Sequence, residues 1–99
     1  MPFQFGPWDF TQAGINRVGE MGGVYGLARP TLANRARFTI LYVGKTGNLR
    51  ARLREHLNIP PASGITHFFA EAHGTDAVRT QREVSLIQEF QPVGNTLHK

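Results

Sequence analysis

Runs of β-branched and aromatic residues predict three strands. Residues 24–29 and 38–43 are both rich in such residues, and the polar tract between them contains turn formers. We therefore expect these two segments to pair as an antiparallel hairpin. A third strand is expected over residues 65–71, where Phe68 and Phe69 would face opposite sides of the sheet.

Apolar residues at helical spacing predict two helices. Leu49, Leu53 and Leu57 recur at every fourth position after the hairpin, with Thr46 or Asn48 as the cap. The turn at residues 74–76 begins a second helix that runs to about residue 90, before a Gln-Pro pair. The expected fold is α+β, with a small central three-stranded antiparallel sheet in the order hairpin, helix, strand, helix, flanked by helices.

The first 21 residues have a different pattern from the rest. Aromatic residues alternate there with Gly and Pro, and a weak helical pattern over residues 9–18 has Asp9 or Thr11 as a possible cap. We expect an N-terminal packing arm over residues 1–21 and a main unit over 22–99, together forming one domain. The tail at residues 93–99 must fold back if it is to have a role.

Composition narrows the chemistry. The chain has 99 residues, 40% of them hydrophobic, which suits one globular domain and excludes a disordered chain. It has no cysteine, so disulfides and thiolate metal sites are excluded, whereas a hard cation held by oxygen is compatible. The longest apolar run is far too short to cross a bilayer and the start lacks a secretion signal, so we expect a soluble cytoplasmic protein without a membrane partner.

Positive charge is concentrated in one part of the chain. The net charge is +4, and residues 17–54 contain eight basic residues against one acidic residue. Such a surface favours a polyanion, of which nucleic acid is the commonest, although a solubilising basic face would have the same composition.

Glu83 is the residue that a purely structural interpretation explains least well. In the predicted second helix it falls on the apolar arc with Leu86 and Ile87. A carboxylate in that position is either functional or paired, with Arg79 one turn earlier or with a cation from a neighbouring element.

Two pairs of basic residues lie on different sides of the first predicted helix. Arg52 and His56 are one turn apart at one edge of the leucine face, where they can reach a site within the fold. Arg50 and Arg54 lie at the opposite edge, where solvent or a phosphate backbone is the expected partner. A histidine in a helix is more often a hydrogen-bonded structural residue than a catalytic one.

Each tyrosine of the predicted hairpin is close to a glycine. Tyr25 follows Gly23 by two positions, and Tyr42 precedes Gly44 by two. The glycines would leave the backbone bare for close approach of a substrate, although a turn or bulge would also use them. Tyrosine alone is simply a good strand former.

In this order and spacing, these residues resemble the GIY-YIG nuclease superfamily. Gly23-Val24-Tyr25 stands where the family has Gly-Ile-Tyr, and Tyr42-Val43-Gly44 where it has Tyr-Ile-Gly. The resemblance covers residues 22–95 and implies a GIY-YIG type fold. The positions that match the family's functional residues are Tyr25, Tyr42, Arg52, His56, Glu83 and Asn95, with Gly23, Gly44 and Lys45 in support. The late asparagine has a form especially similar to the nuclease half of excision-repair incision enzymes.

The resemblance implies a metal-dependent endonuclease that leaves 5′-phosphate and 3′-hydroxyl ends. Glu83 would hold one Mg²⁺ or Mn²⁺, and Arg52 would bind the non-esterified phosphate oxygens. Tyr25 is the first choice for general base and Tyr42 the second, while His56 could accept a proton. Asn95 would orient the tail at the site.

The expected partner is nucleic acid, with DNA preferred, and a targeting partner protein is possible because no separate targeting domain is apparent. The residues expected to contact phosphates are Arg35, Arg37, Lys45, Arg50 and Arg54. Two other interpretations stay open. One is a nucleic-acid-binding module or subunit that does not cut, and the other is a protein-interaction domain.

Overall fold

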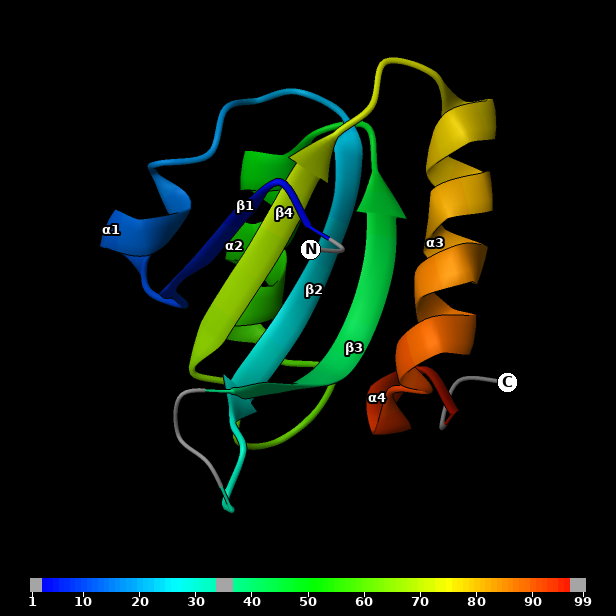
Figure 1. Cartoon of the computed structure of the whole chain (residues 1–99). Coiled ribbons are helices and arrows are strands. Elements are labelled where there is room, and N and C mark those ends of the chain that lie inside the picture. Colours follow the sequence, from blue (N-terminus) through cyan, green and yellow to red (C-terminus); the bar gives the residue numbers. More distant parts are fainter. Residues whose placement is uncertain (1–2, 34–36, 97–99) are drawn as a thin grey trace.

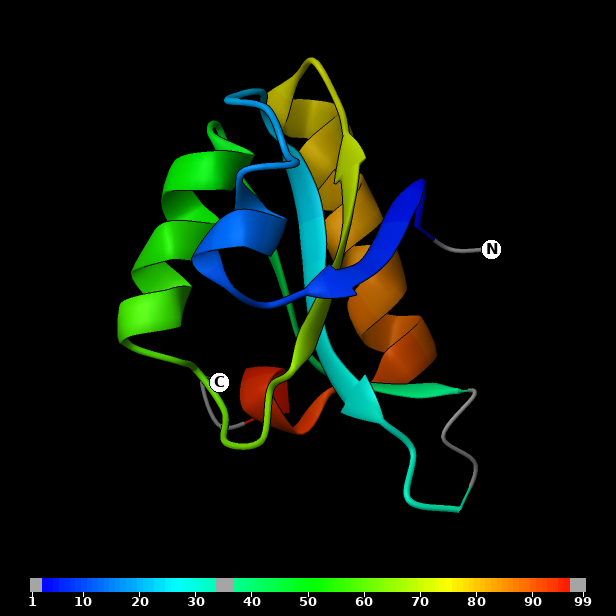
Figure 2. The ribbon, with the colours of Figure 1, turned by 90° about the vertical axis from the view of Figure 1, so that its left-hand side faces the viewer.

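Helices cover both faces of a four-stranded antiparallel sheet in the computed structural model, which describes residues 3–33 and 37–96 (Figures 1 and 2). The strand order is β1-β4-β2-β3. The α+β class is therefore confirmed, but the predicted number of strands was too small by one.

The central hairpin forms as expected and is longer than its apolar runs. Strand β2 (Gly23–Pro30) pairs antiparallel with β3 (Phe38–Thr46), with one irregularity after Leu27. Backbone pairing extends the strands past the β-branched residues because each added ladder bond satisfies a backbone donor or acceptor.

Strand β4 (His67–Ala72) pairs with the other edge of β2, so β2 has a hydrogen-bonded strand on each side. The opposite orientations predicted for two consecutive phenylalanines are confirmed. Phe68 packs with Tyr25 and Leu27 on one face of the sheet, whereas Phe69 packs with Val24 on the other.

Strand β1 (Phe5–Asp9) is the element that sequence patterns did not predict. It pairs antiparallel with β4 at the edge of the sheet, and its register shifts between Phe5 and Trp8. Gly6 and Pro7 interrupt its pattern, and an edge strand tolerates a proline because it needs fewer ladder bonds. The expected packing arm thus contributes a strand, and the helix expected over residues 9–18 is reduced to α1 (Gln12–Ile15), capped by Thr11.

The two predicted long helices lie on opposite faces of the sheet (Figure 2). Helix α2 (Leu49–Asn58), capped by Asn48, packs Leu49 and Leu53 onto the face that carries Phe68. Helix α3 (Asp76–Phe90), capped by Thr75, packs Leu86 onto the other face. Asn48 was one of the two predicted caps, and Thr75 lies in the turn that was predicted to begin the second helix.

The tail folds back as a short helix, α4 (Val93–Thr96), beside β3 (Figure 1). Gln91 has a φ of 46° and ends α3 in the left-handed conformation, before a proline that cannot continue the helix. Within the described ranges, no helix is both long enough and apolar enough to span a membrane.

Candidate active site

Tyr25 and His56 form the centre of the site. Tyr25 points from β2 toward α2 and is only 1% exposed, and its hydroxyl lies 2.7 Å from Nε2 of His56. The helix periodicity that placed His56 beside the leucine face brings its ring over the same side of the sheet. The structure therefore unites a strand residue and a helix residue that are 31 positions apart.

The two glycines serve the fold, which corrects the expectation that they leave room for substrate. Gly44 lies opposite Tyr25 in the strand register, and a Cβ on it would overlap the phenol of Tyr25. A Cβ on Gly23 would collide with the backbone carbonyl of Glu71 in β4. The bare backbone is occupied by protein atoms in both places, and at Gly44 these atoms belong to the phenol of the site.

Burial keeps both central groups uncharged near neutral pH. Desolvation raises the pKa of the Tyr25 phenol, and a hydrogen bond with Arg52 only partly opposes this. Desolvation lowers the pKa of His56, and the positive charge of Arg52 lowers it further. In the imidazole tautomer that carries its proton on Nδ1, the Tyr25 hydroxyl donates to Nε2 of His56, and the neutral ring can then accept one proton.

Arg52 and Tyr42 lie next to His56, on the side that faces solvent. The Arg52 side chain is 43% exposed and pairs with Glu55 at 2.7 Å, and the Glu55 carboxylate raises the pKa of the guanidinium. The ring of Tyr42 lies 5.4 Å from that of His56, centre to centre. An open cleft of about 420 Å³ follows, lined by Tyr42, Arg52, His56, Ile59, Pro60 and Pro61.

Glu83 approaches from the other face, past the edge strand β3. Its side chain is half-buried, and burial raises its pKa while the ammonium and the backbone amide of Lys45 lower it. The Glu83 charge also raises the pKa of Tyr25, so the two groups interact electrostatically. Lys45 itself binds Asp76 at 3.1 Å and Thr80 at 2.7 Å.

Of the two cations considered as partners of Glu83, the structure favours the one from a neighbouring element over Arg79. Arg79 donates from Nε to the carbonyl of His73 at 3.0 Å, and the cation that acts on Glu83 is Lys45, from the neighbouring strand. Glu83 is the sequence-predicted metal ligand, and the described residues contain no group of three or more His, Asp or Glu side chains that could hold a metal.

Asn95 ties the tail to the edge strand. Its Oδ1 accepts from the amide of Val43 and its Nδ2 donates to the carbonyl of the same residue, both at 2.7 Å. Both backbone bonds fall on the residue between Tyr42 and Gly44, so the side chain holds the strand segment that contributes to the cleft.

The basic residues expected to bind phosphates have different environments. Arg50 donates from Nε to the carbonyl of Val18 at 2.8 Å, and exposed Arg54 binds Oδ1 of Asn16 at 3.1 Å. Arg37 is exposed in the β2–β3 connection. Arg35 lies outside the described residues. Arg50 therefore has a structural contact that its position on the helix did not indicate.

Sequence reasoning missed the segment that follows α2. Ile59, Pro60 and Pro61 line the cleft, and Ile59 is 80% exposed. The sequence contained a signal for this segment. Ile59 lies directly after the predicted helix and before two prolines, where no helix or strand pattern would bury its side chain.

Among known proteins, the chain matches solved structures. No family model and no curated protein matches the chain. Solved structures of the GIY-YIG N-terminal endonuclease domain of UvrC from Thermotoga maritima do match. The form bound to its catalytic magnesium has a TM-score of 0.67 and 21% sequence identity, covering 84% of this chain and 92% of that one.

Variants of the same domain bound to a divalent cation agree with this match. One with an Asn→Ala substitution has a TM-score of 0.67 at 21% identity and covers 84% of this chain and 91% of that one. One with a Tyr→Phe substitution has a TM-score of 0.66 with the same identity and coverage. The chain therefore has the fold of the GIY-YIG endonuclease domain of an excision-repair incision enzyme.

Proposed function

We propose that this protein is a metal-dependent endonuclease that hydrolyses phosphodiester bonds, preferably in DNA. The observation that carries the proposal is the buried hydrogen bond between Tyr25 and His56, below Arg52 and within the field of Glu83. A buried tyrosine paired with a neutral histidine can transfer a proton, and packing alone does not require that pairing.

In the proposed reaction, the oxygen of a water attacks phosphorus and the bond to the 3′ oxygen breaks. The water proton moves to the Tyr25 oxygen as the tyrosine proton moves to Nε2 of His56, so one proton ends on the imidazole. Burial and the charge of Arg52 lower the pKa of His56, which favours the neutral ring that can accept this proton. The departing 3′ oxygen takes a proton from solvent, which leaves 5′-phosphate and 3′-hydroxyl ends.

Arg52 is placed to bind the phosphate. Its exposed guanidinium faces the cleft and is permanently charged, so it can offer two parallel donors to the non-esterified oxygens. Phosphate would compete with Glu55 for this group, and an exposed ion pair of this kind contributes little to stability.

Glu83 is the residue that would hold one Mg²⁺ or Mn²⁺. Burial disfavours the charged form of the Glu83 carboxylate, so a nearby cation would stabilise that charge. Magnesium is commonly held by one or two carboxylates together with substrate phosphates. One carboxylate is compatible with an ion that takes its remaining ligands from water and substrate phosphate. When bound, the ion would supply positive charge for the phosphate and the leaving oxygen.

One observation favours a second candidate, a nucleic-acid-binding module that does not cut. The Lys45 ammonium already supplies positive charge near Glu83. In that case the carboxylate would serve the packing of α3 against β3, and metal would have no effect on DNA.

The test is nicking of supercoiled plasmid by purified protein with Mg²⁺ or Mn²⁺. The Glu83→Gln variant keeps the shape of the side chain and removes its charge, so we expect nicking to fall by at least about a hundredfold. Glu89→Gln changes an exposed carboxylate on the same helix and is the matched control.

DNA binding in EDTA should be similar for the parent and both variants. Nicking by Glu83→Gln at the parental rate would contradict the metal assignment. Binding without nicking by the parent in either metal would favour the non-catalytic module.

A further inference from the structure

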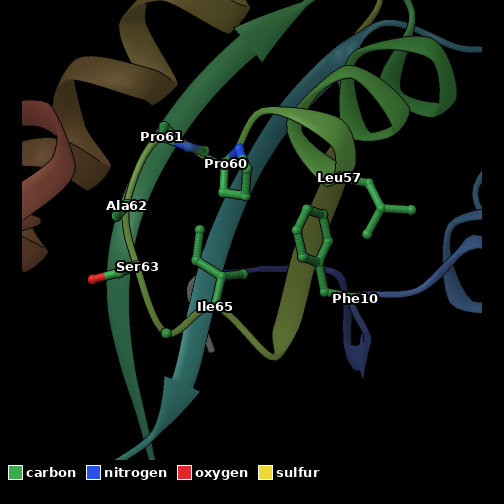
Figure 3. A pocket seen from close by; sticks show the side chains of 8 residues that line it. Phe10, Leu57, Pro60, Pro61, Ala62, Ser63 and Ile65 are labelled. Carbon is green, nitrogen blue, oxygen red and sulfur yellow. The ribbon is translucent and has the colours of Figure 1, made fainter.

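A second cavity, of about 510 Å³, adjoins the proposed catalytic cleft. Figure 3 shows the side chains that line it. The two share Pro60 and Pro61, which therefore form a ridge between them. The remaining lining of the second cavity comes from Phe10, Leu57, Ala62, Ser63, Gly64 and Ile65. Its volume is within the range of small-ligand sites.

The chemistry of this cavity is suited to a flat neutral ring. Its lining has no charged side chain, and the ring of Phe10 and the side chains of Pro60 and Ile65 are turned toward the same space (Figure 3). Ser63 points away from them in the same view. Phe10 is the one aromatic residue of the lining; it is 8% exposed and packs against Phe68 in the core, so it forms the floor of the cavity. A base placed on such apolar walls is held by stacking and apolar contact rather than by hydrogen-bond readout.

Two arginines flank the cavity, and neither belongs to its lining. Arg52 is in the adjoining cleft across the ridge, and the aliphatic stem of the Arg29 side chain lies next to Gly64 at the cavity wall. A nucleotide within a strand can match this arrangement, because its neutral base is attached to a sugar that has an anionic phosphate on each side. A neutral peptide or an acyl chain would leave both cations without an anionic partner.

We propose that this cavity receives one unstacked base of the substrate strand, next to the phosphate that is cut. The inference rests on the proposed endonuclease function and names its substrate class, which is nucleic acid with an unpaired nucleotide at the cleavage site. A base stacked in a duplex cannot enter a cavity behind a ridge, and extrusion is least costly where the base is mismatched or already unpaired.

Ile59 has a part in this arrangement. It stands at the cleft side of the ridge with 80% of its surface exposed, which is unusual for an isoleucine. Apolar side chains that enter a base step stabilise an unstacked strand, so Ile59 would fill the place that the extruded base leaves.

The experiment compares two duplexes of one sequence, one fully paired and one with a single extra unpaired nucleotide at its centre. Affinity is measured by fluorescence anisotropy in EDTA, and nicking is measured with Mg²⁺. We expect the parent to bind the bulged duplex about tenfold more tightly or better, and to cut beside the extra nucleotide.

The variant that fills the cavity is Ala62→Trp, with Ala62→Leu as a milder form should the first fail to fold. Either should lower affinity for the bulged duplex to that for the paired one and leave the latter unchanged. The matched control is Ala77→Trp, on the exposed side of α3, which should keep the preference. Urea unfolding shows whether each variant is folded.

The two proposals fail in different ways. Nicking with equal affinity for the two duplexes, or a preference that both Ala62 variants retain, overturns the base pocket and leaves the endonuclease intact. A preference that the Ala62 variants abolish, without nicking of any DNA, supports the pocket and contradicts cleavage. Gel filtration of the parent and the Ala62 variants tests self-association. If the variants elute at a different volume but still prefer the bulged duplex, the cavity belongs to a self-association surface and the inference is overturned.

Discussion

At the scale of single residues, the strand pair Tyr25 and Gly44 defines the site. The phenol crosses the neighbouring strand in the space that a side chain at position 44 would otherwise take, and this directs its hydroxyl to His56. The glycine is thus a geometric requirement for the hydrogen bond and does not need to contact substrate.

Gly44→Ala is therefore expected to displace the phenol and to lower both stability and nicking. Overpacking of this kind costs about 1–3 kcal/mol, measured as the free energy of unfolding in urea. Gly47→Ala is the matched control, because a Cβ there would meet nothing within 4 Å. Equal behaviour of the two variants would contradict the packing argument.

His56 should make the protein less stable in mild acid. Its pKa is lowered by burial and by Arg52, so the unfolded chain binds a proton more readily than the folded one. The free energy of unfolding therefore falls as pH drops below the unfolded value of about 6.5 toward the lower folded value.

Urea unfolding of the parent and of His56→Gln between pH 5 and 8 measures this contribution, at roughly half-unit steps. The variant should lose less stability toward acid, since it lacks the titrating ring. Parallel curves for the two proteins would show that His56 has the same proton affinity in the folded and unfolded states.

At the scale of elements, the N-terminal segment is held to α2 by polar bonds. Arg50 donates to the carbonyl of Val18 at 2.8 Å and to that of Asn16 at 3.4 Å, which satisfies carbonyls just after the short helix α1. The same surface was expected to bind phosphate, and that role stays a prediction.

Arg50→Ala should lower the free energy of unfolding by about 1–2 kcal/mol, because charge-assisted hydrogen bonds are lost. Arg54→Ala is the control, since Arg54 is exposed and donates to the exposed side-chain oxygen of Asn16, and a loss of about 0.5 kcal/mol or less is expected. Fluorescence of Trp8, the one tryptophan, reports unfolding of the same segment. An equal loss in both variants would contradict the structural role of Arg50.

At the scale of the whole molecule, the site forms at an edge of the sheet because the two long helices lie on opposite faces. Arg52 and His56 come from α2 and Glu83 from α3, and Figure 2 shows these helices on opposite faces of the sheet. Side chains from the two helices can therefore approach one another at an edge of the sheet, and β3 is the edge strand on that side. Asn95 binds both backbone groups of Val43 in that strand and fixes its position.

Sequence patterns predicted most of this framework because they report on near neighbours. The leucine spacing gave α2 with its cap at Asn48, and the turn at Thr75 gave the start of α3. The strand β1 could not be found in this way. Gly6 and Pro7 hide its alternation, and its stability comes from pairing with β4, some 60 residues later.

The sequence by itself predicted the α+β class, and its resemblance to the GIY-YIG nucleases implied the type of fold and the side chains to expect in one site. Only the tertiary structure decided the fourth strand, the partner of Tyr25, the cation beside Glu83 and the cavity behind Pro60. The physical reason is that helix and strand periodicities act over a few residues, whereas each of these features depends on long-range contacts whose loop-closure entropy is offset only when the whole sheet assembles.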